Sequence, residues 1–387
     1  MKRGPMGTYQ TTILDDESVR AFIPRPLPPD PPIAFDGSLQ AVLERSLLSL
    51  GRVDSVSTLL PGTDLFLYAY VRKEAVLSSQ IEGTQSTLSD LLLFELEEAP
   101  GVPLDDVREV SNYVAAMEHG LSRLRGGFPL SSRLIREIHR KLLTSGRGSE
   151  KEPGEFRRSQ NWVGGTRPGT AVFVPPPHTV IADCMGDLEK FLHSGAGLPL
   201  VVQAGLAHVQ FESIHPFLDG NGRVGRLLIT VLLCNAGVLH QPLLYLSLFF
   251  KKQRREYYRL LNAVRTEGDW EEWLRFFLEG VAITAEGAVS TAGRLLELFE
   301  EDQLRIQKLG RRSGSALRVQ DVLKQRPLCT IQEVVKRSGL SFPSAASAME
   351  QLAKKKIARE VTGKKRNRVY SYDRYLKILS EGTEPAA

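Results

Sequence analysis

The sequence predicts a mainly α-helical fold that carries one small β-hairpin and is followed by a helix-turn-helix unit. Two observations lead to this fold class. Apolar residues recur every three or four positions from about Leu39 to Arg311, and this pattern is interrupted only at residues 161–177 and changes after Leu309. The 387 residues, 42% of them hydrophobic, are enough for two or three domains with a sizeable core.

Composition excludes several classes of protein. Three cysteines lie far apart, at Cys184, Cys234 and Cys329, which argues against a disulfide framework and a structural zinc site. The N-terminal residues show no signal-peptide pattern, and the longest mostly apolar run, 227–233, is too short to span a membrane. We therefore expect a cytoplasmic protein without a membrane partner. A net charge of +5 does not by itself indicate nucleic-acid binding.

The expected domains are an N-terminal helical region at 1–110, a catalytic core at 111–300, a linker at 301–315 and a C-terminal domain at 316–380. Residues 1–35 read as irregular, because the prolines of IPRPLPPDPP favour an extended conformation over a helix. We expect this segment to be a surface strap. Helical periodicity predicts helices at 39–50, 66–81, 107–124, 131–143, 180–193, 200–214 and 225–237.

The interruption at NWVGGTRPGTAVFVPPP, residues 161–177, has β-branched and aromatic residues on both sides of a Gly/Pro turn. This pattern predicts a small hairpin that ends at a proline stop. Such a hairpin is either a simple loop or an edge strand offered to a partner.

The stretch HPFLDGNGRVGR, residues 215–226, forms a loop that opens a helix. Its Gly-Asn-Gly permits unusual backbone geometry and a close approach of a ligand to the main chain. Free amides at a helix start bind anions. Arg223 and Arg226, three positions apart, place two guanidinium groups beside these amides, which suits a polyphosphate.

Two further side chains of this stretch carry chemistry. Asp219 offers the hard oxygen that Mg²⁺ on phosphates requires, and His215 can take a proton from a hydroxyl near neutral pH. Each of these groups, taken singly, commonly has a structural role: a histidine before proline is often a packing residue, and Gly-Asn-Gly often forms a turn. The base, the metal ligand, the anion-binding amides and the two arginines together in one short stretch indicate nucleotidyl or phosphoryl transfer.

The same stretch matches the Fic-domain signature HPFx[DE]GNGRxxR at every defined position, so the chain resembles the Fic family. The resemblance implies a helical Fic bundle that transfers AMP from ATP to a Ser, Thr or Tyr hydroxyl of a protein and releases pyrophosphate. Gly222 favours nucleotidyl transfer over phosphorylation, because a relative that acts as a kinase carries lysine there.

The resemblance also implies roles for single residues. His215 is the catalytic base, Asp219 holds Mg²⁺ on the α- and β-phosphates, and Arg226 with Arg223 steadies the β- and γ-phosphates. The residues implied around the α-phosphate are Gly220, Asn221, Gly222 and Arg223.

Resemblance extends to the hairpin and to residues 249–281. The hairpin is similar to the family's flap, which aligns a target segment by strand pairing, and Val163, Gly164 and Gly165 are expected near the nucleotide. Tyr257 and Tyr258 are the expected adenine contacts, with helix packing as the alternative for each. Thr266 stands where some relatives place Asn near the adenine.

The segment SSQIEG resembles the family's inhibitory motif [ST]xxxE[GN]. It lies N-terminal to the core, which is where the second class of the family carries this motif. Ser78 and Glu82 are four positions apart on a helical face, and Gly83 stands where the helix would end. We expect Glu82 to form a bidentate ion pair with Arg226 that blocks productive ATP binding. In some relatives the same glutamate helps to remove AMP, so the reverse reaction stays open.

The C-terminal residues 330–372 have the pattern of a helix-turn-helix followed by a basic hairpin, and they resemble a winged helix. DNA binding on the one hand, and dimerisation or target docking on the other, are equally compatible with this fold. The cations expected to meet DNA phosphates are Lys354, Lys355, Lys356, Lys364, Lys365, Arg366 and Arg368.

Two classes of function therefore compete. The first is an autoinhibited protein adenylyltransferase that uses ATP and Mg²⁺. Its expected partners are a target protein, the protein itself as a second substrate, and a second copy in a homodimer. The second is a DNA-binding regulator whose Fic core senses a nucleotide. Intact His215 and Asp219 favour the first, because a sensor needs no base.

Overall fold

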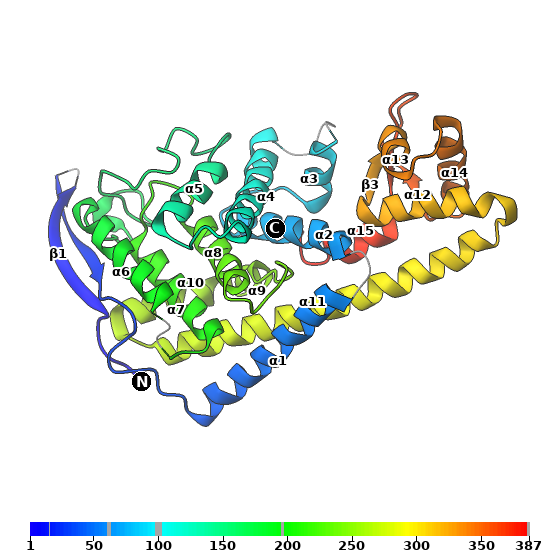
Figure 1. Cartoon of the computed structure of the whole chain (residues 1–387). Helices are drawn as coiled ribbons and strands as arrows, with labels where there is room; N and C mark the ends of the chain where they lie inside the picture. Colours follow the sequence, from blue (N-terminus) through cyan, green and yellow to red (C-terminus); the bar gives the residue numbers. More distant parts are fainter. Residues whose placement is uncertain (15, 60–62, 97–102, 195–196, 385–387) are drawn as a thin grey trace.

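The computed structural model describes residues 1–14, 16–59, 63–96, 103–194 and 197–384 (Figure 1). Within these residues the chain is mainly helical with two small antiparallel sheets, which confirms the predicted fold class. None of the helices in the described ranges combines the length and the apolar composition that a membrane crossing requires.

The sequence suggested that the N-terminal segment is irregular, but part of it forms regular β-structure. Strands β1 (Gly7–Leu14) and β2 (Glu17–Pro24) form an antiparallel hairpin in which Gly7 faces Pro24. The Thr, Tyr and Ile content of β1 favours a strand. The prediction was dominated by the prolines, which begin only where β2 ends.

Helix α11 (Trp270–Gln307) is the longest element among the described residues, and its 38 residues extend over about 57 Å. Helix α1 (Gly37–Leu59) lies along it, and the C-terminal unit sits at its far end (Figure 1). Arg3 fastens the N-terminus to the start of α11, because its buried guanidinium pairs with Glu271 at 2.6 Å.

Helix α7 (Leu200–Ile214) runs through the main body, and its residues from Val201 to Ile214 are all buried. A helix buried on every side marks the centre of a core. The helices of this body are α2 (Thr63–Ile81), α3 (Leu88–Phe94), α4 (Leu104–Arg125), α5 (Ser132–Leu142), α6 (Ile181–His193), α8 (Asn221–Asn235), α9 (Ser247–Lys252) and α10 (Arg254–Glu267).

The hairpin predicted at residues 161–177 is reduced to a single bridge between Val163 and Phe173. A short 3₁₀ helix, Pro168–Thr170, occupies the tip. Strand β2 supports this segment from the side, because Phe22 donates its amide to the Val174 carbonyl at 2.9 Å. The polar main chain is therefore satisfied by tertiary contacts, and a regular two-stranded hairpin is not needed.

The residues expected to form a linker, 301–315, are largely helical: α11 continues to Gln307 and α12 (Ser313–Gln325) begins shortly after it. The C-terminal unit then has β3 (Leu328–Thr330), α13 (Ile331–Ser338), α14 (Phe342–Lys354), β4 (Arg359–Glu360), β5 (Val369–Ser371) and α15 (Asp373–Ser380). Its sheet has the order β3-β5-β4. Its assignment as a winged helix stays a prediction.

A buried carboxylate joins this unit to α11. Asp302 is fully buried and accepts a hydrogen bond from the Tyr372 hydroxyl at 2.8 Å, beside Arg305 at 2.6 Å and Arg374 at 3.4 Å. Because a buried charge is costly unless it is paired and hydrogen-bonded, these donors hold the unit in its position on the helix.

We expect Tyr372→Phe to lower the free energy of unfolding of the C-terminal unit by about 1–2 kcal/mol, because it removes one donor from buried Asp302. Urea unfolding followed by circular dichroism measures this. Tyr375→Phe is the matched control, because the Tyr375 hydroxyl is buried without a partner among the described residues, so its removal should cost nothing. Equal losses in the two variants would contradict the prediction.

Candidate functional site

The loop 215–226 links α7 to α8, as the sequence predicts. His215 ends α7 in the left-handed region, with φ 49° and ψ 59°, and its amide donates to the Phe211 carbonyl at 2.9 Å. This conformation costs a non-glycine residue about 1–2 kcal/mol, so it persists only where neighbouring contacts impose it. The imidazole position is therefore set by the surrounding structure.

Asn221 closes the loop with its own side chain. Its Oδ1 accepts from the Phe217 amide at 2.9 Å and its Nδ2 donates to the Phe217 carbonyl at 2.8 Å. Gly220, at φ 74°, supplies the left-handed residue before α8, whose first intrahelical bond runs from Val224 to Gly220. The Asn221 side chain is thus committed to the loop, and the main-chain amides at the helix start are what remains for an anion.

The His215 imidazole is neutral at physiological pH. Burial lowers its pKa to about 3, and the positive charges of Arg157 and Arg265 add to that shift. A neutral imidazole has a free nitrogen lone pair, so it can accept a proton from a hydroxyl.

Asp219 is held from two sides. Its Oδ1 accepts from the Gly220 amide at 2.5 Å. Its carbonyl accepts from Nε2 of His139 at 3.0 Å, because Nδ1 of His139 already accepts from the Gly154 amide at 2.8 Å. The His139 ring also stacks on Phe217, with centroids 3.7 Å apart. The buried His139 therefore fixes this part of the loop.

Space lies beside the other carboxylate oxygen of Asp219. Gly148 stands there at φ 83°, and a Cβ on it would come within 2.6 Å of Oδ2. The described residues contain no group of three or more His, Cys, Asp or Glu side chains able to hold a metal ion without help. One exposed carboxylate oxygen beside an anion site fits Mg²⁺ that is held mainly by phosphates.

Glu82 lies between the two arginines of the loop. Its Oε1 accepts from Arg226 Nη2 at 2.7 Å, and its Oε2 lies 3.2 Å from Arg223 Nε, without hydrogen-bond alignment. The sequence predicted a bidentate pair of Glu82 with Arg226. Instead, the Glu82 carboxylate bridges two cations, Arg226 and Arg223. Ser78 takes the place of the second carboxylate oxygen: its Oγ accepts from Arg226 Nε at 2.9 Å and its carbonyl from Nη2 at 3.0 Å.

Arg223 is enclosed by acids. It is fully buried, and besides Glu82 it meets Glu109 at 3.0 Å and Asp219 at 3.4 Å. Gly83, at φ 102°, follows Glu82 and turns the chain away from α2. Although burial alone would raise the pKa of Glu82, Arg226 and Arg223 hold it below its usual value. Glu82 is therefore ionised, and this state of the loop is closed by an internal anion.

Gly222 is required by this closure. A Cβ at position 222 would clash with Glu82 Oε1 and lie 2.9 Å from Arg226 Nη1. Any side chain larger than hydrogen would therefore push the carboxylate off Arg226.

Two more carboxylates titrate near the pair. Burial raises the pKa of Glu74 to about 7, against hydrogen bonds from Ser247 at 2.5 and 3.2 Å. Burial also raises the pKa of Glu212 to about 7, although Arg226 opposes the shift, and Oε1 of Glu212 has no hydrogen-bond partner among the described residues. The site thus combines one ionised acid with two that are half-protonated near neutral pH.

The residues expected around the nucleotide lie in different settings. Tyr257 is buried, and its hydroxyl donates to His208 Nε2 at 2.8 Å, so it is a packing residue in this state. Tyr258 is 44% exposed. Gly164 and Gly165, at φ 71° and 75°, turn the chain directly after Val163.

The base of this segment reaches the loop, because Asn161 Nδ2 donates to the Phe217 carbonyl at 3.2 Å. Thr266 bonds only within its helix, to the Asn262 carbonyl at 3.0 Å.

The last turn of α2 also touches the C-terminal residues. Gln80, two positions before Glu82, donates to the carbonyls of Ser86 and Thr383, each at 2.8 Å. Lys251 donates to Gln80 Oε1 at 2.7 Å and to the Glu384 carbonyl. The end of α2, which precedes Glu82, is therefore fastened to residues that follow α15.

The C-terminal cations fall into two groups. Lys365, Arg366 and Arg368 line a groove with Phe342, at the N-terminal end of α14. Lys354, Lys355 and Lys356 lie at the other end of this helix, about 18 Å away along its axis, and are exposed. Lys364 is exposed beside the first group.

Three functional candidates escaped the sequence reasoning: Arg157, His139 and Glu109. They lie 58 to 114 positions from the loop residues that they contact. His139 and Glu109 occupy ordinary positions of amphipathic helices, and Arg157 lies in the turn-rich GEFRR. A buried charge or ring in such places gives no local signal.

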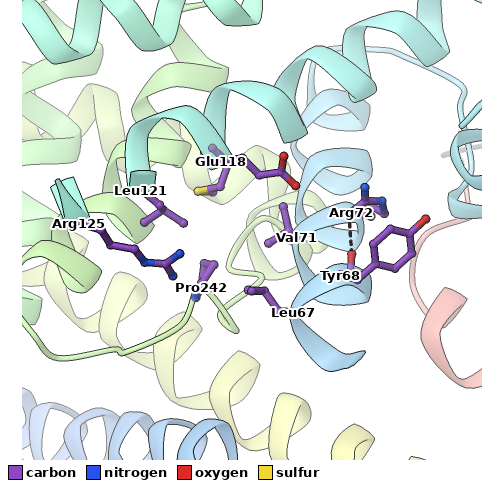
Figure 2. Close-up of a pocket in the computed structure, with 9 residues that line it drawn as sticks. Leu67, Tyr68, Val71, Arg72, Glu118, Leu121, Arg125 and Pro242 are labelled. Carbon is purple, nitrogen blue, oxygen red and sulfur yellow. Dashed lines mark hydrogen bonds between the residues drawn. The ribbon is translucent and has the colours of Figure 1, made fainter. Parts of the chain in front are cut away.

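Figure 2 shows a pocket that lies apart from this loop. Leu67 and Val71 of α2 face Glu118, Leu121 and Arg125 of α4 across it. No lining residue belongs to the loop or to the Ser78–Glu82 turn.

The fold and the site together define a class: a helical-bundle protein with an anion-binding loop at a helix start, held closed by a carboxylate of its own. Residues 129–233 match the Fic/DOC family, and residues 41–122 match the N-terminal domain of that family. The chain thus carries both an N-terminal domain and a core domain of the Fic/DOC type.

Known relatives agree with this assignment. The chain is 33% identical over 251 residues to the protein adenylyltransferase Fic of Drosophila virilis. The aligned region covers 62% of this chain and 48% of that protein. The Drosophila melanogaster protein of the same name gives the same identity, with 47% of it covered. The chain thus spans about half the length of the curated relatives it matches.

Solved structures share the fold. A Fic family protein from Desulfovibrio desulfuricans superposes with a TM-score of 0.58 at 20% identity, over 88% of this chain and 97% of the other. A Fic domain containing signaling protein from Bacteroides thetaiotaomicron gives 0.51 at 22% identity, over 66% and 95%.

Because folded Glu212 keeps its proton up to about pH 7 and the unfolded chain loses it near 4.5, stability falls as pH rises through this window. We expect Glu212→Gln to be more stable than wild type by roughly 2–3 kcal/mol at pH 8 and equally stable at pH 4. Part of the decrease in stability with rising pH remains in this variant, because Glu74 titrates in the same range.

Urea unfolding between pH 4 and 8 measures this dependence. Glu118→Gln is the control, because this exposed carboxylate is remote from the loop and should leave the wild-type pH dependence intact. An unchanged pH dependence in Glu212→Gln would show the prediction to be wrong.

Proposed function

We propose that the protein is an autoinhibited protein adenylyltransferase, which transfers AMP from ATP to a Ser, Thr or Tyr hydroxyl of a target protein and releases pyrophosphate. The carboxylate of Glu82 between Arg226 and Arg223 is the observation that carries this proposal. Two guanidinium groups beside a helix start suit the terminal phosphates of a nucleotide. Glu82 places a negative charge where that substrate would place its own.

His215 is proposed as the base. Its neutral imidazole takes the hydroxyl proton, the hydroxyl oxygen bonds to the α-phosphorus, and the bond from this phosphorus to the bridging oxygen breaks. Pyrophosphate leaves with the electron pair of that bond. The amides that begin α8 are directed at the charge that develops on the α-phosphate.

Asp219 is proposed to hold Mg²⁺, and the space that Gly148 leaves beside its Oδ2 supports this role. The ion, when bound, neutralises phosphate charge and supports departure of the pyrophosphate. Arg226 steadies the terminal phosphates once Glu82 has left it, and Arg223 contributes through the same movement.

The closed pair is proposed as the inhibitory arrangement of the family's second class. With Glu82 in place, Ser78 and Glu82 engage Nε and Nη2 of Arg226, so these two nitrogens are not available to a phosphate. The same carboxylate keeps AMP removal open as an alternative reaction, since it lies next to the anion site and can orient a water molecule.

Substrate placement is proposed along two elements. Val163, Gly164 and Gly165 lie at the exposed turn of the flap segment, which we propose aligns the target and borders the nucleotide. Tyr258, half-exposed, is a better adenine contact than Tyr257, whose hydroxyl is engaged with His208.

The proposed setting is the reducing cytoplasm, which the free thiols of Cys184, Cys234 and Cys329 support. Self-modification and homodimer formation belong to the same proposal.

Glu82→Gly should raise AMP transfer at least about tenfold, because it frees Arg226 for the terminal phosphates. In the double variant Glu82→Gly/His215→Ala, transfer should vanish while Mg²⁺-ATP still binds, because only the base is lost. Intact-mass spectrometry with ATP and cell lysate detects the added AMP, and calorimetry measures nucleotide binding.

Gln85→Gly is the matched control. This exposed residue lies three positions after Glu82 and does not touch the arginines, so its replacement tests whether a looser turn alone activates the protein. Equal transfer in wild type and Glu82→Gly would reject the inhibitory role of Glu82. Absence of both Mg²⁺-ATP binding and transfer in Glu82→Gly would reject the enzyme.

A second candidate function concerns the C-terminal unit, which we propose binds DNA phosphates. The groove between the wing cations and Phe342 supports it, because Lys365, Arg366 and Arg368 gather beside the start of α14. Dimerisation or target docking through the same surface is the alternative.

Full-length protein with Lys364, Lys365 and Arg366 replaced by Ala should bind duplex DNA more weakly, with a salt dependence reduced by about 0.9 for each lost phosphate contact. Fluorescence anisotropy at several salt concentrations measures both quantities. The charge-matched control replaces Lys141, Lys151 and Lys190, exposed residues of the main body, and should change neither. If wild type binds no DNA at low salt, the unit serves dimerisation or docking.

A further inference from the structure

One arginine outside the loop connects the site with the flap segment. Arg157 is only 2% exposed, and its guanidinium donates to three main-chain carbonyls: Nε to His215 at 3.0 Å, Nη1 to Ser159 at 2.9 Å and Nη2 to Pro176 at 2.5 Å. Its amide donates to the Pro216 carbonyl at 2.9 Å. All three guanidinium nitrogens are thus engaged.

This arrangement is unusual for a buried cation. Within the described ranges no carboxylate forms an ion pair with Arg157, and burial lowers its pKa to about 10. A buried charge without an ionic partner is expensive unless several hydrogen bonds compensate it. Three carbonyls in the plane of a guanidinium fork provide that compensation, and lysine, with its single nitrogen, cannot reach all three.

Two of the three carbonyls mark the ends of the flap segment. Ser159 and Pro176 stand on either side of the Val163–Phe173 bridge, so a single side chain holds both ends of the segment together. Gln160 adds a bond from Nε2 to the Pro175 carbonyl at 2.8 Å. With only one bridge inside the segment, its position depends on these contacts at its base.

The third carbonyl belongs to His215, whose left-handed conformation needs support from outside. The His215 amide is held by Phe211 and its carbonyl by Arg157, so both of its main-chain polar groups are fixed. The direction of the imidazole follows from this backbone. The Arg157 guanidinium thus contacts the proposed base and both ends of the flap segment.

We propose that Arg157 is a positioning residue that sets the proposed base His215 and the flap segment 160–175 in register, so that the target hydroxyl and the imidazole meet in one geometry. This inference rests on the adenylyltransferase function proposed above. Arg157 touches no reacting atom in this scheme; it acts through three carbonyl oxygens. Nucleotide binding, which uses α8 and Arg226, does not depend on it.

The kinetic test uses Arg157→Lys and Arg157→Gln in the activated Glu82→Gly protein. Because misplacement by about 1 Å costs on the order of 100-fold in rate, we expect kcat for AMP transfer to fall about 100-fold in both. The KM for Mg²⁺-ATP should stay within about twofold. Arg3→Lys is the control: Arg3 is equally buried but pairs with Glu271 at the start of α11, so its variant should keep kcat.

The pH profile of kcat separates the effect of the Arg157 charge from the effect of its hydrogen-bond geometry. Removing the Arg157 charge should move the acidic limb of the kcat profile to higher pH in Arg157→Gln, since that charge lowers the pKa of His215. Arg157→Lys keeps the charge and should keep the wild-type limb despite its low rate. An unchanged kcat in either variant, or an equal rise of KM and loss of kcat, would overturn the proposal.

A measurement without activity separates this proposal from the proposed function. Hydrogen–deuterium exchange of residues 160–175 and 214–218 should rise at least about tenfold in Arg157→Gln, while exchange in α11 stays unchanged. This result supports the positioning role even if no AMP transfer is found. Exchange that is unchanged in both segments, or raised throughout the chain, refutes it.

Discussion

The site depends on a carboxylate placed between two arginines. Both arginines lie in the interior: Glu82 is the ion-pair partner of Arg226, and it adds to the negative charge that Glu109 and Asp219 already place beside Arg223. Removing one partner of a buried ion pair typically costs about 3–5 kcal/mol. An anionic substrate would therefore have to replace Glu82 with at least comparable interactions. The inhibition proposed for Glu82 and the stability of the loop would then come from the same contact.

Around this contact, the loop is held by main-chain groups more than by its own side chains. Asn221 closes it on Phe217, His139 holds the Asp219 carbonyl, and Arg157 holds the His215 carbonyl. The contacts from His139 and Arg157 act on main-chain carbonyls, so they fix the loop without engaging the imidazole of His215 or the carboxylate of Asp219. This arrangement also explains why a strained backbone persists at His215: its polar groups are satisfied only in this conformation.

The sequence predicted features that are written in contiguous residues. The helical class, the loop between α7 and α8 and the proximity of Glu82 to Arg226 follow from local patterns in the sequence. The orientation of the carboxylate does not, because Ser78 occupies Nε of Arg226 and Arg223 attracts the second oxygen of Glu82. The β1–β2 hairpin was missed because the prolines that follow it dominated the reading. The predicted flap hairpin has one bridge, because β2 and Arg157 satisfy main-chain groups that periodicity assigns to strand pairing. Arg157 and His139 are invisible locally, since each acts on a residue 58 or more positions away.

The bond from Gln80 to the Thr383 carbonyl gives the molecule a two-way connection. Gln80 and Glu82 share the last turn of one helix and its exit, so displacement of the carboxylate also changes what the C-terminal residues rest on. Thermodynamic linkage is reciprocal: if a partner of the C-terminal unit shifted this turn, it would alter the affinity for the proposed nucleotide, and the nucleotide would alter the affinity for that partner by the same factor. The shared turn would then connect the two proposed functions of the chain.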